Sequence, residues 1–174
     1  MTFDSMRIMQ KFVEDYLGDY KEKKLRILEI GSFCGSAPEK DLVFRRFFRN
    51  PNWEFIGMDI VSGPNVDVVS EEMYHYPFAD NSFDVVISGS TFEHVKDIYK
   101  VTKEMERITS NLVCIAVPNT APYHCHPVDC WRIFPDGLNF LLTEIARMEV
   151  LRCKMAGNNK NFTVGIAKKI CVTI

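Results

Sequence analysis

The chain has 174 residues, of which 47% are hydrophobic and 25% charged, with a formal net charge of −2. This length predicts a single domain, residues 1–174, with a substantial core. The small net charge, without a basic block, argues against a broad nucleic-acid-binding surface, and no apolar stretch approaches the roughly 20 residues that span a bilayer.

The first half of the chain alternates predicted helices and strands. Apolar residues at helical spacing predict an amphipathic helix over about residues 4–18, with Gly18 as its stop. A second helix is predicted over 41–49, with Pro38 suited to its first turn. Strands are predicted over 25–30, 53–60, 66–69 and 83–88.

The second half continues this pattern and ends differently. An apolar face from Val95 to Ile108 predicts a helix, and a strand over 111–117 is stopped by Pro118. A polar loop, 119–135, precedes a helix marked by apolar positions from 138 to 148. Two final strands, 150–155 and 162–172, read as a hairpin. The alternation predicts an α/β fold with a mostly parallel sheet and an antiparallel edge.

A glycine-bearing turn follows the first strand. Gly31 and Gly35 are spaced G-x-x-x-G, and Glu29 lies just before them. A strand, a tight turn and a helix together are how α/β proteins hold a nucleotide-like ligand at the carboxyl edge of a sheet. Glycine permits close backbone approach and positive φ. A turn that needs glycine without any ligand is the alternative.

Asp59 stands at the end of the predicted second strand. A carboxylate in this position can accept hydrogen bonds from both hydroxyls of a ribose. The alternative is a solvated carboxylate at a strand end.

Four blocks occur in order along the chain: Leu28-Glu-Ile-Gly, Gly57-Met-Asp, the run from Pro77 to Val86, and Phe92-Glu-His-Val. With them the chain resembles the class I S-adenosylmethionine-dependent methyltransferases, and among these the methyltransferase type 11 group, from about Leu25 to Leu142. The resemblance implies a Rossmann-like, doubly wound sheet of seven strands in the order 3-2-1-4-5-7-6, with helices on both faces. It also implies S-adenosyl-L-methionine as cofactor and methyl transfer as reaction.

The resemblance assigns cofactor-binding roles residue by residue. The methionine part would face Glu29, Gly31, Ser32, Phe33 and Gly35. Asp59 would bind the ribose, and Ile60 would lie against the adenine. Glu72 and Met73 would contact the adenine edge, and Ser88 and Gly89 would lie beside the sulfonium.

Two departures from the family pattern motivate another interpretation. Phe33 stands where the loop usually has its middle glycine, and only residues 61–65 separate the second and third strands. A binding module that keeps the methyltransferase fold without turnover is therefore the alternative function. A nicotinamide oxidoreductase is disfavoured because G-x-G-x-x-G is missing.

The loop after the fifth strand contains His-Pro-x-Asp-x-Trp-Arg, from His126 to Arg132, and resembles a signature of this methyltransferase subgroup. The resemblance places the loop over the transferring methyl group. His126 and Asp129, then His94, are the candidates for activating an acceptor. Aromatic, acidic and cationic groups together suit a small polar or sugar-like metabolite. The alternatives are a structural latch in which Asp129 pairs with Arg132, and a helix-capping role for His94.

The same loop holds zinc-type ligands at His124, Cys125, His126 and Cys130, but it offers no second spaced pair, so no metal is predicted. None of the six cysteines forms a Cys-x-x-Cys pair. Free thiols, and an N-terminus without a signal-peptide pattern, favour a cytoplasmic setting. The expected partner is a small-molecule substrate, with no nucleic acid and no membrane.

Overall fold

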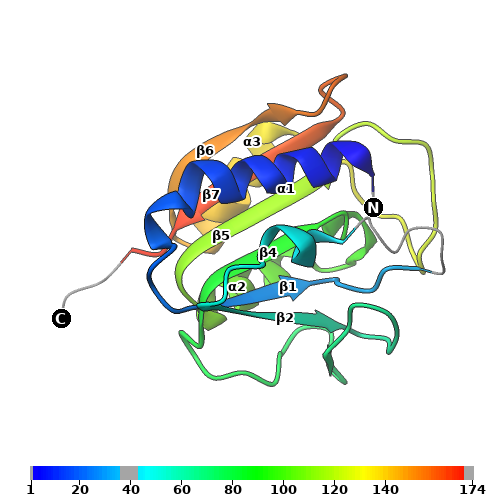
Figure 1. Cartoon of the computed structure of the whole chain (residues 1–174). Helices are drawn as coiled ribbons and strands as arrows, with labels where there is room; N and C mark the ends of the chain where they lie inside the picture. Colours follow the sequence, from blue (N-terminus) through cyan, green and yellow to red (C-terminus); the bar gives the residue numbers. More distant parts are fainter. Residues whose placement is uncertain (1, 36–42, 171–174) are drawn as a thin grey trace.

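A computed structural model describes residues 2–35 and 43–170 of the chain. Its centre is a seven-stranded sheet in the order β3-β2-β1-β4-β5-β7-β6, which confirms the predicted order (Figure 1). The strands are β1 (Leu25–Ile30), β2 (Trp53–Asp59), β3 (Val68–Val69), β4 (Phe83–Gly89), β5 (Thr109–Pro118), β6 (Glu149–Ala156) and β7 (Phe162–Lys168). The first five strands run parallel, and β7 pairs antiparallel with both β5 and β6.

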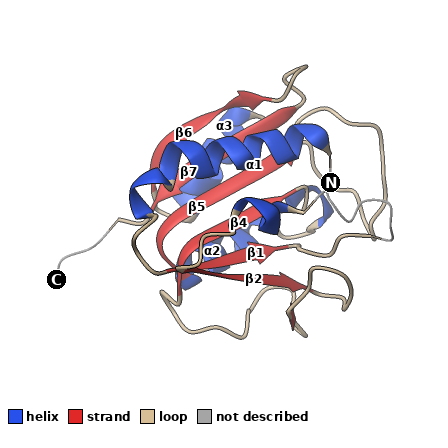
Figure 2. Cartoon of the chain, viewed as in Figure 1, coloured by secondary structure: helices blue, strands red, loops and turns tan. Residues whose placement is uncertain are grey.

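Helices cover both faces of the sheet (Figure 2). The helices are α1 (Phe3–Tyr16), α2 (Ile98–Ile108) and α3 (Pro135–Phe140), and α3 continues into the π-turn η5 (Leu141–Ile145). Short 3₁₀ turns are η1 (Gly18–Tyr20), η3 (Phe44–Phe47) and η4 (Phe92–His94). Helix α1 packs on one face, and α2 and α3 pack on the other.

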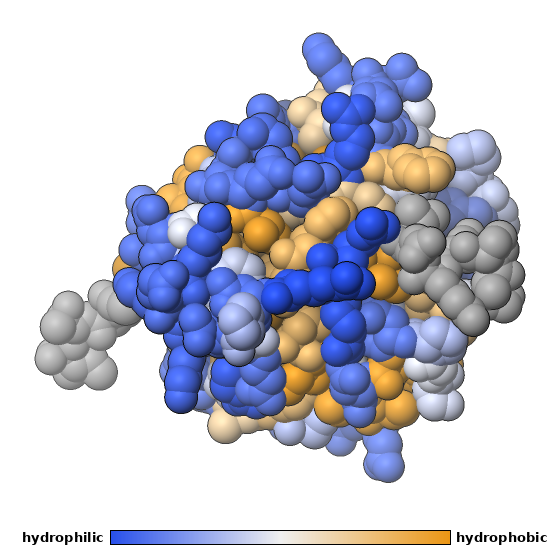
Figure 3. All heavy atoms as spheres, viewed as in Figure 1, coloured by the Kyte–Doolittle hydropathy of each residue, from blue (hydrophilic) through white to orange (hydrophobic). Residues whose placement is uncertain are grey.

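The central strands are apolar because side chains on both of their faces are buried. Along β1, Ile27 points into the core under α1 and Leu28 into the core under α2, and both are fully buried. Helix α1 begins with a capping box in which Thr2 Oγ1 accepts from the backbone N–H of Ser5 at 3.2 Å. Polar side chains cover its outer surface (Figure 3), so α1 is amphipathic as predicted.

Several predicted elements differ from the structure. Of the helix predicted over 41–49, residues 43–49 are described and contain the 3₁₀ turn Phe44–Phe47, while residues 41–42 and Pro38 lie outside the described residues. The last strand, predicted over 162–172, ends at Lys168. The third strand is limited to Val68–Val69. The helix predicted up to Met148 ends at Ile145, because Arg147 takes a φ of 54°, which no right-handed helix allows.

The described helices include none with both the length and the apolar character needed to cross a bilayer.

Candidate active site

The turn after β1 requires glycine at its first position. Gly31 has a φ of +77°, and a Cβ built there would lie 2.1 Å from Thr91 Oγ1. Thr91 follows β4 and donates from its hydroxyl to the carbonyl of Ile30 at 3.3 Å. The close packing of these two strand ends therefore explains Gly31 even without a ligand.

Gly35 is different. No atom of the described residues lies within 4 Å of a Cβ built there, and its φ is not in the left-handed region. Within the described part of the chain, open space beside the backbone remains at Gly35.

The carboxylate of Asp59 is oriented by three backbone N–H groups. Oδ2 accepts from Phe33 at 2.9 Å, and Oδ1 accepts from Ile60 at 2.7 Å and from Val61 at 3.4 Å. Oδ2 therefore keeps a further lone pair, and on Oδ1 the second bond, from Val61, is the long one. The ring of Phe33 packs against Gly63, where a Cβ would come within 2.4 Å of Cε2. The Phe33 side chain thus packs on Gly63, and its backbone N–H still reaches the Asp59 carboxylate.

Glu29 is fully buried behind this turn. Its Oε2 accepts from Asn65 Nδ2 at 3.1 Å, and Oε1 has no hydrogen-bond partner among the described residues. Burial raises the pKa of Glu29 to about 8, against the opposing effect of the Asn65 hydrogen bond. Asn65 Nδ2 also donates to the carbonyl of Ser32 at 2.9 Å, so Glu29 is tied to both the turn after β1 and the connector after β2.

A cavity of about 1030 Å³ lies at the carboxyl edge of the sheet. Its walls come from the turn after β1, the ends of β2 and β4, the connector after β3 and the loop after β5. Of the predicted site residues, those in the lining are Gly31, Phe33, Gly35, Asp59, Ile60, Met73, His94 and His126. Those outside it are Glu29, Ser32, Glu72, Ser88, Gly89 and Asp129.

Two of the predicted residues outside the lining have clear packing roles. Ser88 is buried and donates from its hydroxyl to the carbonyl of Ile30 at 3.1 Å, which links β4 to β1. Gly89 is covered by Phe44, whose Cε2 would lie 2.3 Å from a Cβ at this position. Both residues therefore support the end of β4 from behind the cavity.

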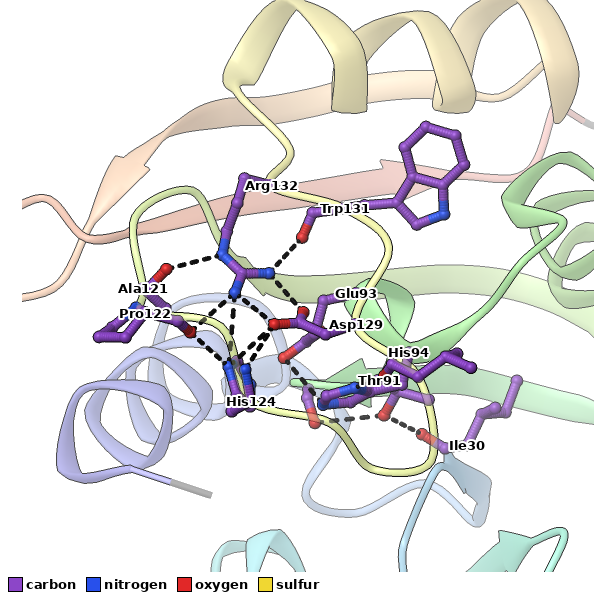
Figure 4. A network of polar contacts seen from close by, with 12 residues as sticks. Ile30, Thr91, Glu93, His94, Ala121, Pro122, His124, Asp129, Trp131 and Arg132 are labelled. Carbon is purple, nitrogen blue, oxygen red and sulfur yellow. Dashed lines mark hydrogen bonds and ion pairs between the residues drawn. The ribbon is translucent and has the colours of Figure 1, made fainter.

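Asp129 and Arg132 form a latch inside the loop after β5 (Figure 4). Arg132 Nη1 lies 2.6 Å from Oδ1 and Nη2 lies 2.7 Å from Oδ2, so the pair is bidentate. The Asp129 side chain is only 1% exposed, and the guanidinium lowers its pKa well below the usual range. Arg132 also donates to the carbonyls of Ala121 and Pro122 at 3.1 and 2.9 Å.

Trp131 anchors the same loop to the segment after β4. Its Nε1–H donates to the carbonyl of Val95 at 2.7 Å. Neither Trp131 nor Tyr123 lines the cavity, and Tyr123 is 76% exposed. The latch that the sequence left as an alternative is present in the structure.

Two titratable residues in the cavity wall were not among the predicted catalytic or cofactor-binding residues: Glu93, and His124, which was considered as a zinc-type ligand alone. Glu93 is fully buried, and neither carboxylate oxygen has a hydrogen-bond partner among the described residues. Burial raises its pKa to about 7. The Phe92-Glu-His-Val block contained the signal, but from it His94 alone was considered as a candidate for catalysis.

His94 lies beside Glu93, with its Nε2 at 3.8 Å from Oε1 of that residue. Its Nδ1 lies 2.6 Å from the carbonyl of Val128, which can only accept, so Nδ1 carries the proton. Burial lowers the pKa of His94. The ring therefore presents an unprotonated Nε2 at neutral pH.

The chain matches the family model described as "Methyltransferase domain" over residues 43–112. A SAM-dependent methyltransferase from Aquifex aeolicus aligns over 97% of this chain and 100% of its own, with a TM-score of 0.63 and 15% identity. Magnesium protoporphyrin IX methyltransferase from Synechocystis PCC 6803, with bound SAH, aligns over 95% of this chain and 83% of its own, with a TM-score of 0.62 and 11% identity. The chain has the fold of the class I S-adenosylmethionine-dependent methyltransferases, and residues 43–112 match the model of their domain.

Not every protein with this fold is named for methyl transfer. The [4+2]-cyclase SpnF aligns over 94% of this chain and 80% of its own, with a TM-score of 0.63 and 13% identity. No curated protein matches the chain significantly. The likeness of fold therefore leaves the acceptor open.

S-adenosyl-L-methionine, the cofactor of the methyltransferases that share this fold, fits the residues present. Asp59 is pre-oriented with a free lone pair on Oδ2, and Ile60, 41% exposed, adds apolar surface next to it. Met73 supplies a further apolar wall. The cavity volume is at the upper end of the range for ligand sites, which leaves room for an acceptor beside S-adenosyl-L-methionine.

Proposed function

We propose that the protein transfers the methyl group of S-adenosyl-L-methionine to a small polar or sugar-like acceptor. One observation carries the proposal: a single cavity joins the cofactor-type residues at the ends of β1 and β2 to a histidine-bearing wall after β4 and β5. β2 and β5 are separated by β1 and β4, so the cavity spans about 14 Å of sheet edge. This span suits a cofactor and an acceptor side by side.

The cofactor supplies an activated methyl group on its sulfonium, so the protein's part is binding and orientation. Asp59 accepts the ribose hydroxyls, and Ile60 and Met73 flank the adenine. Gly31 and Gly35 let the loop approach the methionine part. These assignments follow the cavity lining.

His94 and His126 are the residues that accept the acceptor's proton in this proposal. Both line the cavity, and His94 is neutral at working pH because burial lowers its pKa. Asp129 acts as a positioning residue, because Arg132 and the backbone N–H of His124 occupy its carboxylate.

A second function is favoured by Phe33. Its side chain is 41% exposed and lines the cavity in place of a glycine. In this second function the Phe33 side chain narrows the cavity at the glycine loop, and the chain binds the cofactor or a related nucleoside without transferring a methyl group. We retain this binding module as the alternative.

One two-stage experiment tests both. Calorimetry first measures binding of S-adenosylmethionine and S-adenosylhomocysteine to the whole chain. Incubation with methyl-labelled S-adenosylmethionine and fractionated small metabolites then follows transfer by mass spectrometry. Binding with a labelled product supports the methyltransferase, and binding without product from any fraction supports the binding module. Absence of binding by either compound contradicts both.

We also propose a cytoplasmic setting, because four cysteines in the described part of the chain form no disulfide: Cys114, Cys125, Cys130 and Cys153.

A further inference from the structure

Three metal-ligand side chains converge where the segment after β4 meets the loop after β5. Glu93 and His94 belong to η4, and His124 lies in the loop. Their ligand atoms all lie within 4.8 Å of one another. The rings of His94 and His124 stand 5.0 Å apart at 89°. The sheet makes this convergence possible, because β4 and β5 are neighbouring parallel strands and both segments leave the same edge.

Within this cluster, the Glu93 carboxylate lacks a hydrogen-bond donor or cation, in the described part of the chain, that would compensate its burial. Its carboxylate is completely buried, and both oxygens are without a hydrogen-bond partner among the described residues. A buried carboxylate left in this condition carries a desolvation penalty that native proteins compensate with a donor or a cation. The cationic side chain of the loop is not that partner, because Arg132 is held by Asp129. Glu93 therefore faces the cavity as an acceptor without a donor.

The two histidines are arranged as metal ligands usually are. His94 Nδ1 lies 2.6 Å from the carbonyl of Val128, and His124 Nδ1 lies 2.9 Å from the carbonyl of Pro122. Arg132 Nη2 also approaches His124 Nδ1, at the longer distance of 3.4 Å. A ring whose Nδ1–H donates to a backbone carbonyl keeps its lone pair on Nε2, which is the usual outer-sphere arrangement of ligating histidines.

The latch holds His124 in place. Asp129 Oδ2 accepts from the backbone N–H of His124 at 2.7 Å, while Arg132 holds both carboxylate oxygens. The loop side of the cluster is thus pre-organised, and η4 on the other side is tied to it by the Cys130 N–H, which donates to the carbonyl of Glu93 at 2.7 Å.

We propose that Glu93, His94 and His124 form a binding site for a divalent transition-metal ion of the zinc class. Two imidazoles and one carboxylate are the donor set of catalytic zinc sites, which leave a coordination position open. The sequence alone predicts no metal because the loop has no second spaced ligand pair. The structure supplies that pair from η4.

The open position would face the cavity, which all three residues line. His126 lies next to the cluster, with its ring 6.0 Å from that of His94. With His94 Nε2 on the ion, His126 is the histidine left to accept the acceptor's proton. An ion here would hold an oxygen of the acceptor, a role that rests on the proposed function. The site itself does not, and metal binding can be measured without cofactor or acceptor.

The test uses the whole chain after chelator treatment and dialysis. Titration with Zn²⁺ by calorimetry, and metal analysis after gel filtration, should give one ion per chain. Co²⁺ should give the visible absorption of a low-coordinate nitrogen and oxygen site. His94→Ala, His124→Ala and Glu93→Gln should each lower the affinity by about 100-fold or more, since even outer-sphere changes cost 10–100-fold.

Two control variants separate this site from adventitious binding. His75→Ala changes a histidine with a 69% exposed side chain outside the cavity and should leave the affinity unchanged. Cys125→Ser/Cys130→Ser removes the loop thiols and should also leave it unchanged. Any one of three results overturns the proposal. The cysteine variant loses Zn²⁺ binding, all three ligand variants bind Zn²⁺ as tightly as the parent chain, or the parent chain holds no stoichiometric ion. S-adenosylhomocysteine binding by the metal-free chain tests the proposed function separately.

Discussion

The backbone N–H of Phe33 donates to Oδ2 of Asp59 at 2.9 Å. The loop that departs from the family's glycine pattern is thereby attached to the carboxylate proposed to bind ribose. Because the bond comes from the main chain, a side chain at position 33 does not prevent it. The departure at Phe33 changes the shape of the cavity wall and leaves the orientation of Asp59 intact.

Asp59→Ala should lower the affinity for S-adenosylhomocysteine at least about tenfold, the equivalent of about 1.4 kcal/mol. The variant loses the ribose acceptor and the group that aligns the N–H donors of Phe33, Ile60 and Val61. Calorimetry measures the effect. Asp19→Ala, at an exposed position outside the cavity, is the matched control, and equal affinity in both variants would contradict the ribose assignment.

Gly31→Ala should destabilise the protein by about 2–4 kcal/mol, because it combines a positive φ with a steric clash. The new Cβ would lie 2.1 Å from Thr91 Oγ1 and 2.5 Å from its Cγ2. Urea unfolding measures the difference. Gly18→Ala, where no described atom lies within 4 Å, should change stability by less than about 1 kcal/mol.

The clash itself can be tested by a double-mutant cycle. Thr91→Ala removes the two nearest crowding atoms and leaves Cβ, at 2.8 Å, so it should recover part of the loss caused by Gly31→Ala. Strict additivity of the two changes would show that Thr91 is not the neighbour that excludes a side chain at Gly31.

Glu29→Gln should remove part of the pH dependence of folding. The pKa of Glu29 is raised from 4.5 to about 8 by burial, so between these values the unfolded chain loses a proton that the folded chain keeps. Stability from this group is complete below about pH 4.5 and is lost as pH rises through about 8. From pH 5 to pH 8, the free energy of unfolding of the variant should therefore rise relative to that of the parent by at least about 1.4 kcal/mol, the equivalent of one pKa unit.

Chemical unfolding at the two pH values measures this gain. Glu22→Gln changes an exposed carboxylate and should follow the parent at both. If the free energy of unfolding of Glu29→Gln changed with pH as that of the parent does, Glu29 would ionise in the folded chain as it does in the unfolded one.

Asp129→Ala should loosen the loop over 119–134 and cost about 1–3 kcal/mol, because it removes the bidentate partner of Arg132 and the acceptor for the His124 N–H. Hydrogen exchange should show faster exchange at His124. Asp80→Ala breaks another Arg–Asp pair, with Arg107, but its carboxylate is 71% exposed and its loss should cost less than about 1 kcal/mol. An equal loss of unfolding free energy in the two variants would mean that burial of Asp129 does not strengthen its pairing with Arg132.

Local pattern was sufficient for most strands. β1 has the predicted bounds, 25–30, because an apolar run between a charged segment and a glycine turn has few other ways to be buried. The helix predicted up to Met148 was wrong at its end, since Arg147 adopts a positive φ that apolar spacing does not reveal. Among the described residues the predicted helix around Phe44 is a 3₁₀ turn, and the Phe44 ring packs on Gly89 far along the chain, a contact that local apolar spacing does not reveal.

By itself, the sequence determined the order of elements, the glycine turn and the acidic residue at the end of β2, because each depends on residues close together in the chain. Only the tertiary structure decided which loop residues face the cavity. Asp129 is occupied by Arg132, whereas Glu93 and His94 meet His124. The reason is physical: these contacts join segments that leave neighbouring strands β4 and β5, and the sheet alone sets the distance between those strands.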